Sequence, residues 1–487
     1  MSAGMLPALL LVPLLGAICI ACAGRWPNLR EGISLLTAVT LAALVFSWVP
    51  AIMAGELPRI ILTEPLPGIA IALSLEPLGM LFACIASFLW IINTIYSIGY
   101  MRGNDEKHQT RFYICFALAI AATMGIALAD NLFTLFLFYE MLTLSTYPLV
   151  AHKGNAATIA SARVYLGILL ATSIGLLLPA IIWTWLAAGT TQFTPGGILE
   201  GKVGGAAVGF LLGLFIFGIG KAAVMPVHRW LPAAMVAPTP VSALLHAVAV
   251  VKAGVFSVTK IIIYIFGADF LFSQPSAQWL LYAACFTIVA ASVVALYQTN
   301  LKRMLAYSTI AQLSYVILAV VVLTPMATKG ASLHIAAHAF GKITLFFAAG
   351  AIYTASHKTE LWQLAGIGRR MPLTMAAFTI GALSMIGVPP TAGFISKWFM
   401  FGGAFDSGNY LAVATIVTST ALNAMYFLPV LYLAWLAPAP AGLDMDHGEA
   451  PVAILVAISL TMALTVLFFF FNQPVLALDQ LLVENLR

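Results

Sequence analysis

The sequence predicts an all-α polytopic membrane protein with about fourteen transmembrane helices. Hydrophobic residues make up 62% of the chain and charged residues only 8%, whereas a typical soluble protein has ~25% charged residues. Apolar stretches of about 20 residues, the length that crosses a bilayer, recur from end to end. The chain therefore lacks the polar residues that a water-exposed surface needs, and no soluble domain fits between the apolar stretches.

The expected spans start at the N-terminus. The first apolar stretch is long enough to cross a bilayer and lacks the basic residues of a signal peptide, so we expect a retained helix. A tight turn at Asp130 and Asn131 is expected to join the fourth and fifth spans. The fourteen spans lie near residues 5–24, 31–54, 78–101, 111–129, 131–150, 159–187, 205–235, 241–266, 277–298, 302–325, 330–355, 372–405, 410–437 and 451–476.

Two of these spans are interrupted by proline. Pro226 follows Lys221 in the seventh span, and Pro389 and Pro390 lie at the centre of the twelfth. Proline removes a backbone donor and clashes with the preceding turn, and free backbone at membrane depth is tolerated only where protein or water satisfies it. Broken helices in two halves of a chain indicate a transport site.

The two halves show weak internal similarity, which predicts a repeat. Three residue pairs recur at offsets of 167 to 169 residues: Asn131-Leu132 with Asn300-Leu301, Ile219-Gly220 with Ile386-Gly387, and Arg229-Trp230 with Lys397-Trp398. A shift of five spans is odd, so the second copy is expected to be inverted in the membrane. We therefore divide the chain into helices 1–3 (1–108), a first five-helix repeat (109–268), a second, inverted repeat (275–437), and an acidic loop with the last helix (438–487).

Lysine and arginine are unevenly distributed between the loops on the two sides. If the N-terminus lies outside, thirteen basic residues fall in cytoplasmic loops and five on the opposite side, which is the usual bias. The acidic loop APAPAGLDMDHGEAP is an exception, but acidic residues count little in this rule. Both termini are therefore predicted outside a cytoplasmic membrane. The net charge of +5 follows the loops, and no nucleic-acid patch is expected.

Four lysines and one glutamate interrupt apolar stretches, which is costly: Glu140, Lys221, Lys252, Lys342 and Lys397. An ionisable group at membrane depth costs ~2.5–3.5 kcal/mol on insertion scales and marks ion or proton paths. Burial favours the neutral form of such a group, and an opposite charge favours the charged form. A Glu140–Lys221 pair that forms and breaks would therefore switch the lysine between holding and releasing a proton. A static ion pair that holds helices together is the alternative.

Three histidines extend this set. His334, His338 and Lys342 are four residues apart and fall on one helical face, an arrangement that suits a water-bridged proton row. His246 and Lys252 are six residues apart, which in an α-helix places them ~120° apart on different faces. Zinc at His334 and His338 is the alternative, but no other His, Asp, Glu or Cys on this helix completes a ligand set.

The five cysteines are expected to take part in helix packing. All five lie inside apolar stretches, and the C-x-x-C of Cys19 and Cys22 has no second pair. Free cysteine packs as a small hydrophobic residue. The sequence also lacks a dinucleotide fingerprint, a haem-ligand pattern and an iron–sulfur cysteine set, so neither a cofactor nor a metal is expected in this chain.

Residues 221–247, KAAVMPVHRWLPAAMVAPTPVSALLHA, resemble the signature of the antiporter-like subunits of respiratory complex I, membrane-bound hydrogenases and Mrp-type cation/proton antiporters. The segments LKRMLAYSTIAQLSY, HAFGK and GVPPTAGFISKW are similar to further motifs of this family. The resemblance covers the chain from the third span onward. It implies a charged axis along the membrane midplane with proton half-channels, and it assigns to that axis Glu140, Lys221, Lys252, His334, His338 and Lys397.

Within this family the sequence is most similar to the D-type member of Mrp multisubunit antiporters, because some complex I members carry glutamate where this chain has Lys397. We therefore expect a proton-translocating subunit of a multisubunit Na⁺/proton antiporter in the bacterial inner membrane. Its partners would be other membrane subunits, the lipid bilayer and protons, with Na⁺ as an open question. In the expected mechanism, a proton reaches Lys221 from the cytoplasm and passes by Lys252 and the eleventh-span row to Lys397.

Two alternatives remain. The chain could be a proton-pumping membrane-arm subunit of a complex I-type NADH:quinone oxidoreductase or a membrane-bound hydrogenase, in which redox chemistry belongs to partner subunits. Whether the chain forms part of an enzyme is therefore left open. It could also be a structural scaffold whose charges only lock helices together.

Overall fold

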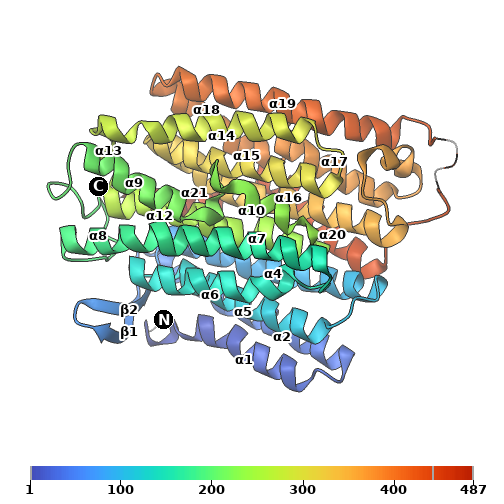
Figure 1. Cartoon of the computed structure of the whole chain (residues 1–487), viewed down its shortest axis with the longest axis horizontal. Helices are drawn as coiled ribbons and strands as arrows, with labels where there is room; N and C mark the ends of the chain where they lie inside the picture. The colour runs from blue at the N-terminus through green and yellow to red at the C-terminus, as the bar shows by residue number, and fades with distance from the viewer. Residues whose placement is uncertain (1–2, 441, 443, 485–487) are drawn as a thin grey trace.

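The computed structural model describes residues 3–440, 442 and 444–484. Within these residues, long helices lie side by side along one common direction, and the loops gather at the two ends of the bundle (Figure 1). Twelve helical segments are long and apolar enough to cross a membrane, and each matches a predicted span. The two interrupted spans contain the shorter apolar helices Ala206–Gly218 and Pro372–Ile386. The prediction of a multi-pass helical membrane protein is confirmed.

The bounds of the elements agree with the expected spans to within a few residues at most ends. The α-helices are α1 (Ala8–Cys22), α2 (Pro27–Phe46), α3 (Val49–Met53), α4 (Pro77–Gly103), α5 (Gln109–Ala127), α6 (Leu132–Val150), α7 (Ala156–Thr172), α8 (Leu178–Ala188), α9 (Ala206–Gly218), α10 (Trp230–Ala233), α11 (Thr239–Ala243), α12 (Val250–Ile261), α13 (Ala268–Phe272), α14 (Trp279–Leu296), α15 (Leu301–Val321), α16 (Pro325–Ser356), α17 (Pro372–Ile386), α18 (Ala392–Asp406), α19 (Tyr410–Trp435), α20 (Val452–Phe470) and α21 (Gln473–Glu484). The 3₁₀ turns are η1 (Ala3–Met5), η3 (Gly220–Ala222), η4 (Val227–Arg229), η5 (Ala234–Val236), η8 (Pro275–Ala277), η9 (Leu361–Leu364) and η10 (Ile367–Arg369), and the π-helical segments are η2 (Ser173–Leu177), η6 (Leu244–Val248) and η7 (Ile262–Phe266).

A β-hairpin departs from the expected all-α fold. The antiparallel strands β1 (Arg59–Leu66) and β2 (Ile69–Ser74) project from one end of the bundle (Figure 1). Backbone hydrogen bonds from Ser74 N to Leu128 O (2.8 Å) and from Asp130 N to Ala72 O (3.2 Å) fasten the hairpin to the α5–α6 turn. We call this end of the molecule the hairpin face and the opposite end the loop face. The strands are too short to register as spans, so a search for apolar length misses them.

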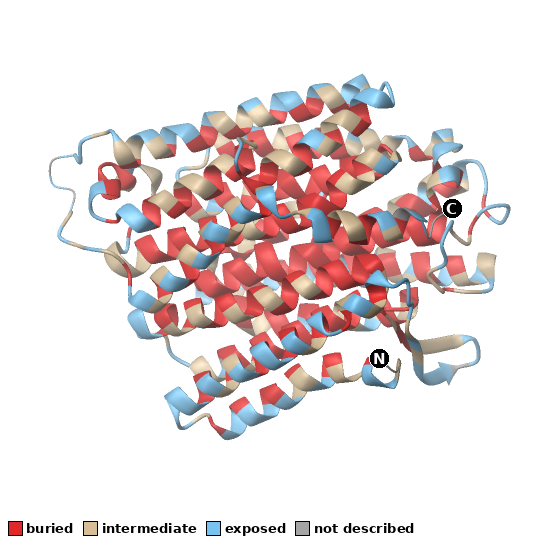
Figure 2. Ribbon diagram, turned by 180° about the vertical axis from the view of Figure 1, so that it is seen from behind, coloured by how far each residue is buried: buried red, intermediate tan, exposed pale blue. Residues whose placement is uncertain are grey.

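Burial separates central helices from peripheral ones (Figure 2). The segment from α11 through η7 is completely buried, and α15 and α16 are nearly so. By contrast, α1, α2, α19 and α20 leave apolar side chains exposed, among them Leu15, Leu36, Val417 and Val456. Such apolar outer faces suit lipid, which offers no hydrogen-bond partner. A polar group on α12 or α16 must therefore find its partner inside the protein.

Both expected helix breaks occur where the prolines predict them. The chain leaves α9 at Gly218 and continues through the short turns η3 and η4, with Pro226 between them. In the second break, α17 ends at Ile386 and Gly387 follows with φ +93°, the left-handed conformation that commonly terminates a helix at glycine. Side chains bind the carbonyls that the breaks leave free: Trp230 Nε1 donates to Gly220 O at the first, and Lys397 Nζ to Met385 O and Ile386 O at the second.

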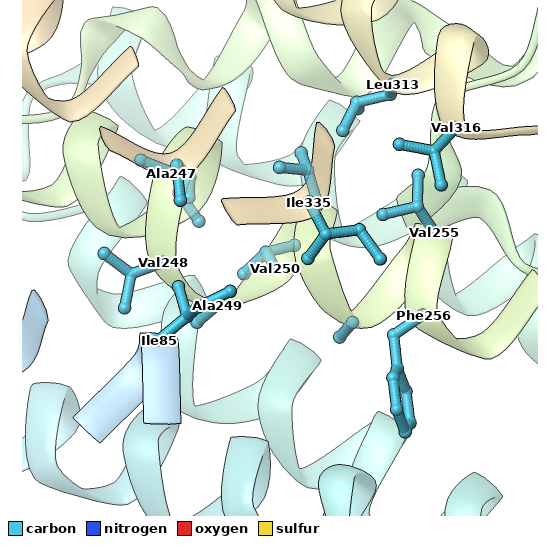
Figure 3. Packing of buried hydrophobic residues seen from close by; sticks show 14 of the residues in the cluster. Ile85, Ala247, Val248, Ala249, Val250, Val255, Phe256, Leu313, Val316 and Ile335 are labelled. Atoms are coloured by element: carbon cyan, nitrogen blue, oxygen red, sulfur yellow. The ribbon is translucent and has the colours of Figure 1, made fainter. Parts of the chain in front are cut away.

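The central span is not a uniform α-helix. His246 lies in the π-helical segment η6, which precedes α12. An i→i+5 turn shifts the phase of the residues that follow it, so the ~120° separation expected between His246 and Lys252 for an α-helix does not apply. Apolar side chains of this span, such as Val248 and Val255, belong to the same buried cluster as those of neighbouring helices, such as Ile335 of α16 (Figure 3).

A further helix, α21, follows the last span and was not expected. It contacts α4 and α16, and Ser332 Oγ on α16 donates to Asp479 Oδ1 at 2.6 Å. The division of the chain into two inverted repeats and the orientation of the termini stay predictions.

Asp479 is expected to make stability depend on pH. Burial raises the pKa of Asp479 from its ordinary value of 3.8 to about 6. The folded state thus favours the neutral carboxyl; this contribution is complete below pH 3.8 and is lost as the pH rises through about 6. The thermal unfolding midpoint of Asp479→Asn in detergent should therefore vary less than that of the wild type between about pH 4 and 7. Asp406→Asn, at an exposed carboxylate, is the control. An unchanged profile in Asp479→Asn would contradict the prediction.

Candidate functional site

Lys221 lies in η3 at the first helix break and is fully buried. Its Nζ donates to Tyr139 O (2.8 Å) and Thr143 Oγ1 (2.5 Å) on α6, and it lies 3.2 Å from the centroid of the Tyr139 ring. Tyr139 Oη also accepts from the backbone N–H of Lys221 at 3.0 Å. Carbonyl and hydroxyl dipoles and an aromatic face therefore hold this amine.

Glu140 does not pair with Lys221 in this structure. The two groups interact electrostatically, but the ion pairs among the described residues do not include them. Glu140 is partly exposed on α6, and its Oε1 atom is buried without a hydrogen-bond partner in the described chain. In this structure, the carboxylate of Glu140 and the amine of Lys221 are therefore separated.

Lys252 on α12 joins the histidines of α16. Its Nζ lies 2.8 Å from His338 Nδ1, and the His338 ring centroid lies 6.0 Å from that of His334. His334 Nδ1 is in turn 2.8 Å from Ser396 Oγ on α18. The next residue in the chain is Lys397. This row, from Lys252 through His338 and His334 to Ser396, crosses from the central span to the second break.

Lys342 begins a second row. Its Nζ donates to Ser308 Oγ at 2.7 Å and to Leu305 O at 3.3 Å on α15. Tyr426 Oη on α19 lies 2.9 Å from Ser308 Oγ and 2.5 Å from Asn423 Oδ1. Hydroxyl groups donate and accept at once, so the hydroxyls of Ser308 and Tyr426 can pass a proton to and from Lys342.

The second row also ends at Lys397. Asn423 Nδ2 donates to Met385 O at 3.2 Å, and Lys397 Nζ donates to Met385 O (2.8 Å) and Ile386 O (2.9 Å). These carbonyls belong to the last turn of α17, where four carbonyls lack helical partners and the helix dipole is negative. Lys397 is 6% exposed, so it does not extend its amine to an interface.

His246 approaches the second row from the central span. Its Nδ1 lies 3.1 Å from Thr309 Oγ1, beside Ser308, and its ring packs on Phe346. Nε2 of His246, like Nε2 of His334 and His338, is buried and has no hydrogen-bond partner in the described chain. Buried polar atoms of this kind are normally satisfied by water, which would extend the rows.

The Lys221 pocket and Lys252 are joined by packing alone. Within the part of the chain that the structure describes, no hydrogen bond connects them. Instead, Gly254 of α12 lies directly against the backbone of Lys221 and Ala222, where any Cβ atom would overlap it.

Gly254→Ala should therefore destabilise the protein. The added methyl group has to push η3 away from α12, and overpacking of this kind typically costs ~1–3 kcal/mol. A lower thermal unfolding midpoint in detergent is expected. Gly167→Ala is the matched control, because a Cβ at this helical glycine of α7 meets nothing within 4 Å. Equal midpoints for the two variants would show that the backbone contact is unimportant.

Several polar residues of the Lys221 pocket and of the two rows and their surroundings were not predicted from the sequence. They are uncharged: Thr143, Ser308, Thr309, Ser396, Asn423 and Tyr426. A search for ionisable groups in apolar stretches does not find hydroxyls and amides, which are common in membrane helices. Ser396 could have been found by its position, because it immediately precedes Lys397. For metals, no group of three or more His, Cys, Asp or Glu suited to an ion occurs among the described residues.

Comparison with known proteins identifies the family. The family described as NADH:quinone oxidoreductase/Mrp antiporter, TM, matches residues 129–423, more than half of the sequence. The chain belongs to this family. All the predicted site residues and helix-breaking prolines, from Glu140 to Lys397, lie within the matched range.

Individual relatives agree with this membership. The chain is 32% identical over 465 residues to NADH-quinone oxidoreductase subunit N of Desulforudis audaxviator (strain MP104C), with 93% of this chain and 92% of that protein covered. It superposes on a chain of the Mrp complex from Dietzia sp. DQ12-45-1b with a TM-score of 0.87 at 22% identity, covering 99% and 97%. A chain of the membrane-bound sulfane sulfur reductase, an archaeal respiratory membrane complex, gives 0.84 at 23% identity, covering 99% and 97%. These two structural likenesses establish the fold.

Proposed function

We propose that this family member translocates protons across the membrane as one subunit of a multisubunit complex. The observation that carries the proposal is the row from Lys252 through His338 and His334 to Ser396, which crosses a completely buried centre and ends beside Lys397. Ionisable groups are costly at this depth, and those that occur there usually mark an ion or proton path. Lysine, imidazole and hydroxyl groups can each take up and release protons, so the row can carry charge sideways through the bundle.

The first row gives the proton a way toward Lys397, and the second stores or exchanges a proton near it. In the first, the Lys252 ammonium passes a proton to His338 Nδ1, and the other ring nitrogen passes one onward. In the second row, Lys342 can exchange a proton with the hydroxyls of Ser308 and Tyr426, and the amide of Asn423 holds Tyr426 in place. Lys221 charges and discharges within its own pocket, and Glu140 attracts the charge without pairing in the observed arrangement.

A cavity on the loop face offers a point of proton uptake. It has a volume of about 160 Å³ and is lined in part by Lys153, Lys302, Lys358, Tyr100 and Tyr353. Lys302, which donates to Ala237 O at 2.7 Å, stands at the start of the helix that carries Ser308 and Thr309. We propose that this face is cytoplasmic and that both termini lie outside, in the inner membrane of a bacterium, as the positive-inside bias predicts.

For the assembly, we put a respiratory membrane complex first. The reason is the 32% identity to a NADH-quinone oxidoreductase subunit over 92% of that protein. A cation/proton antiporter, the assembly expected from the sequence, stands second. The retained Lys397 supports it, and exchange of Na⁺ belongs to this second candidate only.

One experiment tests the function and separates the two assemblies. Membrane vesicles containing the complete complex are followed with a pH-sensitive dye after addition of either NADH or a Na⁺ pulse. Proton movement driven by NADH supports the respiratory complex, and movement driven by Na⁺ alone supports the antiporter. If neither driver moves protons in vesicles that contain the assembled complex, the proposed function is wrong.

A further inference from the structure

An ion pair between Lys260 and Glu76 lies outside both rows. Lys260 Nζ is 3.1 Å from Glu76 Oε1, and the two side chains are 1% and 12% exposed. Lys260 lies in the last turns of α12, inside the completely buried segment. Glu76 immediately precedes α4. A buried ion pair is seldom the most stable choice for its site, because desolvation offsets the attraction.

The pair lies on the same helix as Lys252. Eight residues separate Lys252 from Lys260, which is ~12 Å along an α-helix. Ser257 lies between them, and its buried Oγ has no hydrogen-bond partner in the described chain. The Phe256 ring centroid is 5.6 Å from Lys260 Nζ. Thr259, the other hydroxyl in this stretch, donates to Val255 O at 2.8 Å, so among the described residues the Ser257 hydroxyl is the one left free to relay a proton.

From the pair, charged groups continue to the surface. Lys260 Nζ donates to Ala129 O at 2.6 Å, and the next residue is Asp130. The carboxylate of Asp130 is held at both oxygens by Arg59 Nε (3.0 Å each) and at 2.9 Å by Arg59 Nη2. Arg59 stands on strand β1 with its side chain 44% exposed. The line therefore leads from the buried centre to the hairpin face.

We propose that Glu76 is the proton-release group of the first half of the chain, on the hairpin face. A proton coming from Lys252 by way of Ser257 binds the Glu76 carboxylate and makes it neutral. The same proton then leaves to water beside Asp130, which restores the carboxylate. Lys260 holds Glu76 in place, and Tyr264 of η7 is the other titratable neighbour of Glu76. The inference rests on the proposed function.

The test uses vesicles that contain the complete complex. Glu76→Gln should assemble normally and lower proton translocation by at least about tenfold, the lower range of effects of removing a proton-transfer group. Glu76→Asp should retain translocation with a shifted dependence on the pH at the hairpin face. Glu200→Gln, which removes an exposed carboxylate from the loop before α9, is the control and should behave like the wild type.

Two further variants separate release from structure. Glu76→Gln combined with Lys260→Met removes both charges, so a buried charge is not left unpaired. If this double variant assembles without translocating, the release role is supported. If it or Glu76→Gln translocates at the wild-type rate, or if Glu76→Asp keeps the wild-type pH profile, the inference is overturned. Lys221→Met is measured in parallel: normal translocation there would exclude a relay role for Lys221 only, whereas the absence of proton movement in the wild-type complex would overturn the proposed function itself.

Discussion

Lys221→Met should lower proton translocation by at least about tenfold while the complex still assembles. Methionine has a similar size and can fill the pocket between η3 and α6. Loss of the amine leaves Tyr139 O with a hydrogen-bond donor, because Thr143 Oγ1 already donates to it at 3.1 Å. The variant therefore removes proton exchange at the first break without removing a structural anchor. Dye-monitored translocation, with complex abundance in the same membranes, measures both effects.

Lys221→Arg makes this experiment decisive. Arginine keeps the positive charge but does not release its proton in proteins, so a relay should fail as it does in Lys221→Met. A scaffold that needs only the charge should instead tolerate arginine. Lys202→Met, at an exposed lysine that donates only to Ala188 O, is the control. Full translocation by both Lys221 variants would exclude a relay role for this residue.

The second large effect is expected at the contact between Lys252 and His338. Lys252→Met and His338→Gln should each lower translocation by at least about tenfold, because each interrupts the same row. The double variant should translocate about as fast as the slower of the two single variants, since residues that act as a unit show strongly non-additive losses. Translocation rates of the four proteins, normalised to assembled complex, give the coupling directly.

The outcome of this cycle has a clear alternative. If the losses of the two single variants multiply in the double variant, Lys252 and His338 act in separate steps and the row is not continuous. His108→Gln, at an exposed histidine that precedes α5, controls for the loss of a histidine and should leave translocation unchanged.

The sequence was sufficient to predict the spans and the breaks, for a simple reason. Membrane thickness sets the length of an apolar helix, and proline sets where a helix stops, so both features are local. The hairpin and α21 depend on contacts with the rest of the molecule. Strands β1 and β2 are held by the α5–α6 turn, and α21 by a carboxyl group that meets Ser332 of α16.

The candidate site was predictable in its ionisable residues and not in their partners. Lys252 and His338 both stand out in apolar stretches, but 86 residues separate them, and no local pattern shows that they meet. The same holds for Lys397, whose partners are backbone carbonyls of Met385 and Ile386. Backbone groups carry no sequence signal at all. The π-helical segment at His246 contains neither proline nor glycine to mark it, so the sequence did not show that the α-helical spacing between His246 and Lys252 does not apply there.

The amines at the two breaks are anchored by uncharged oxygen atoms: Tyr139 O and Thr143 Oγ1 for Lys221, and Met385 O and Ile386 O for Lys397. A lysine that discharges beside a carboxylate strands a bare anion in a low-dielectric interior, which is expensive. A lysine that discharges beside neutral carbonyl or hydroxyl groups leaves no unpaired charge. Each lysine can therefore gain and lose its proton without leaving an unpaired charge behind. A carboxylate engineered next to either amine would instead trap the proton there.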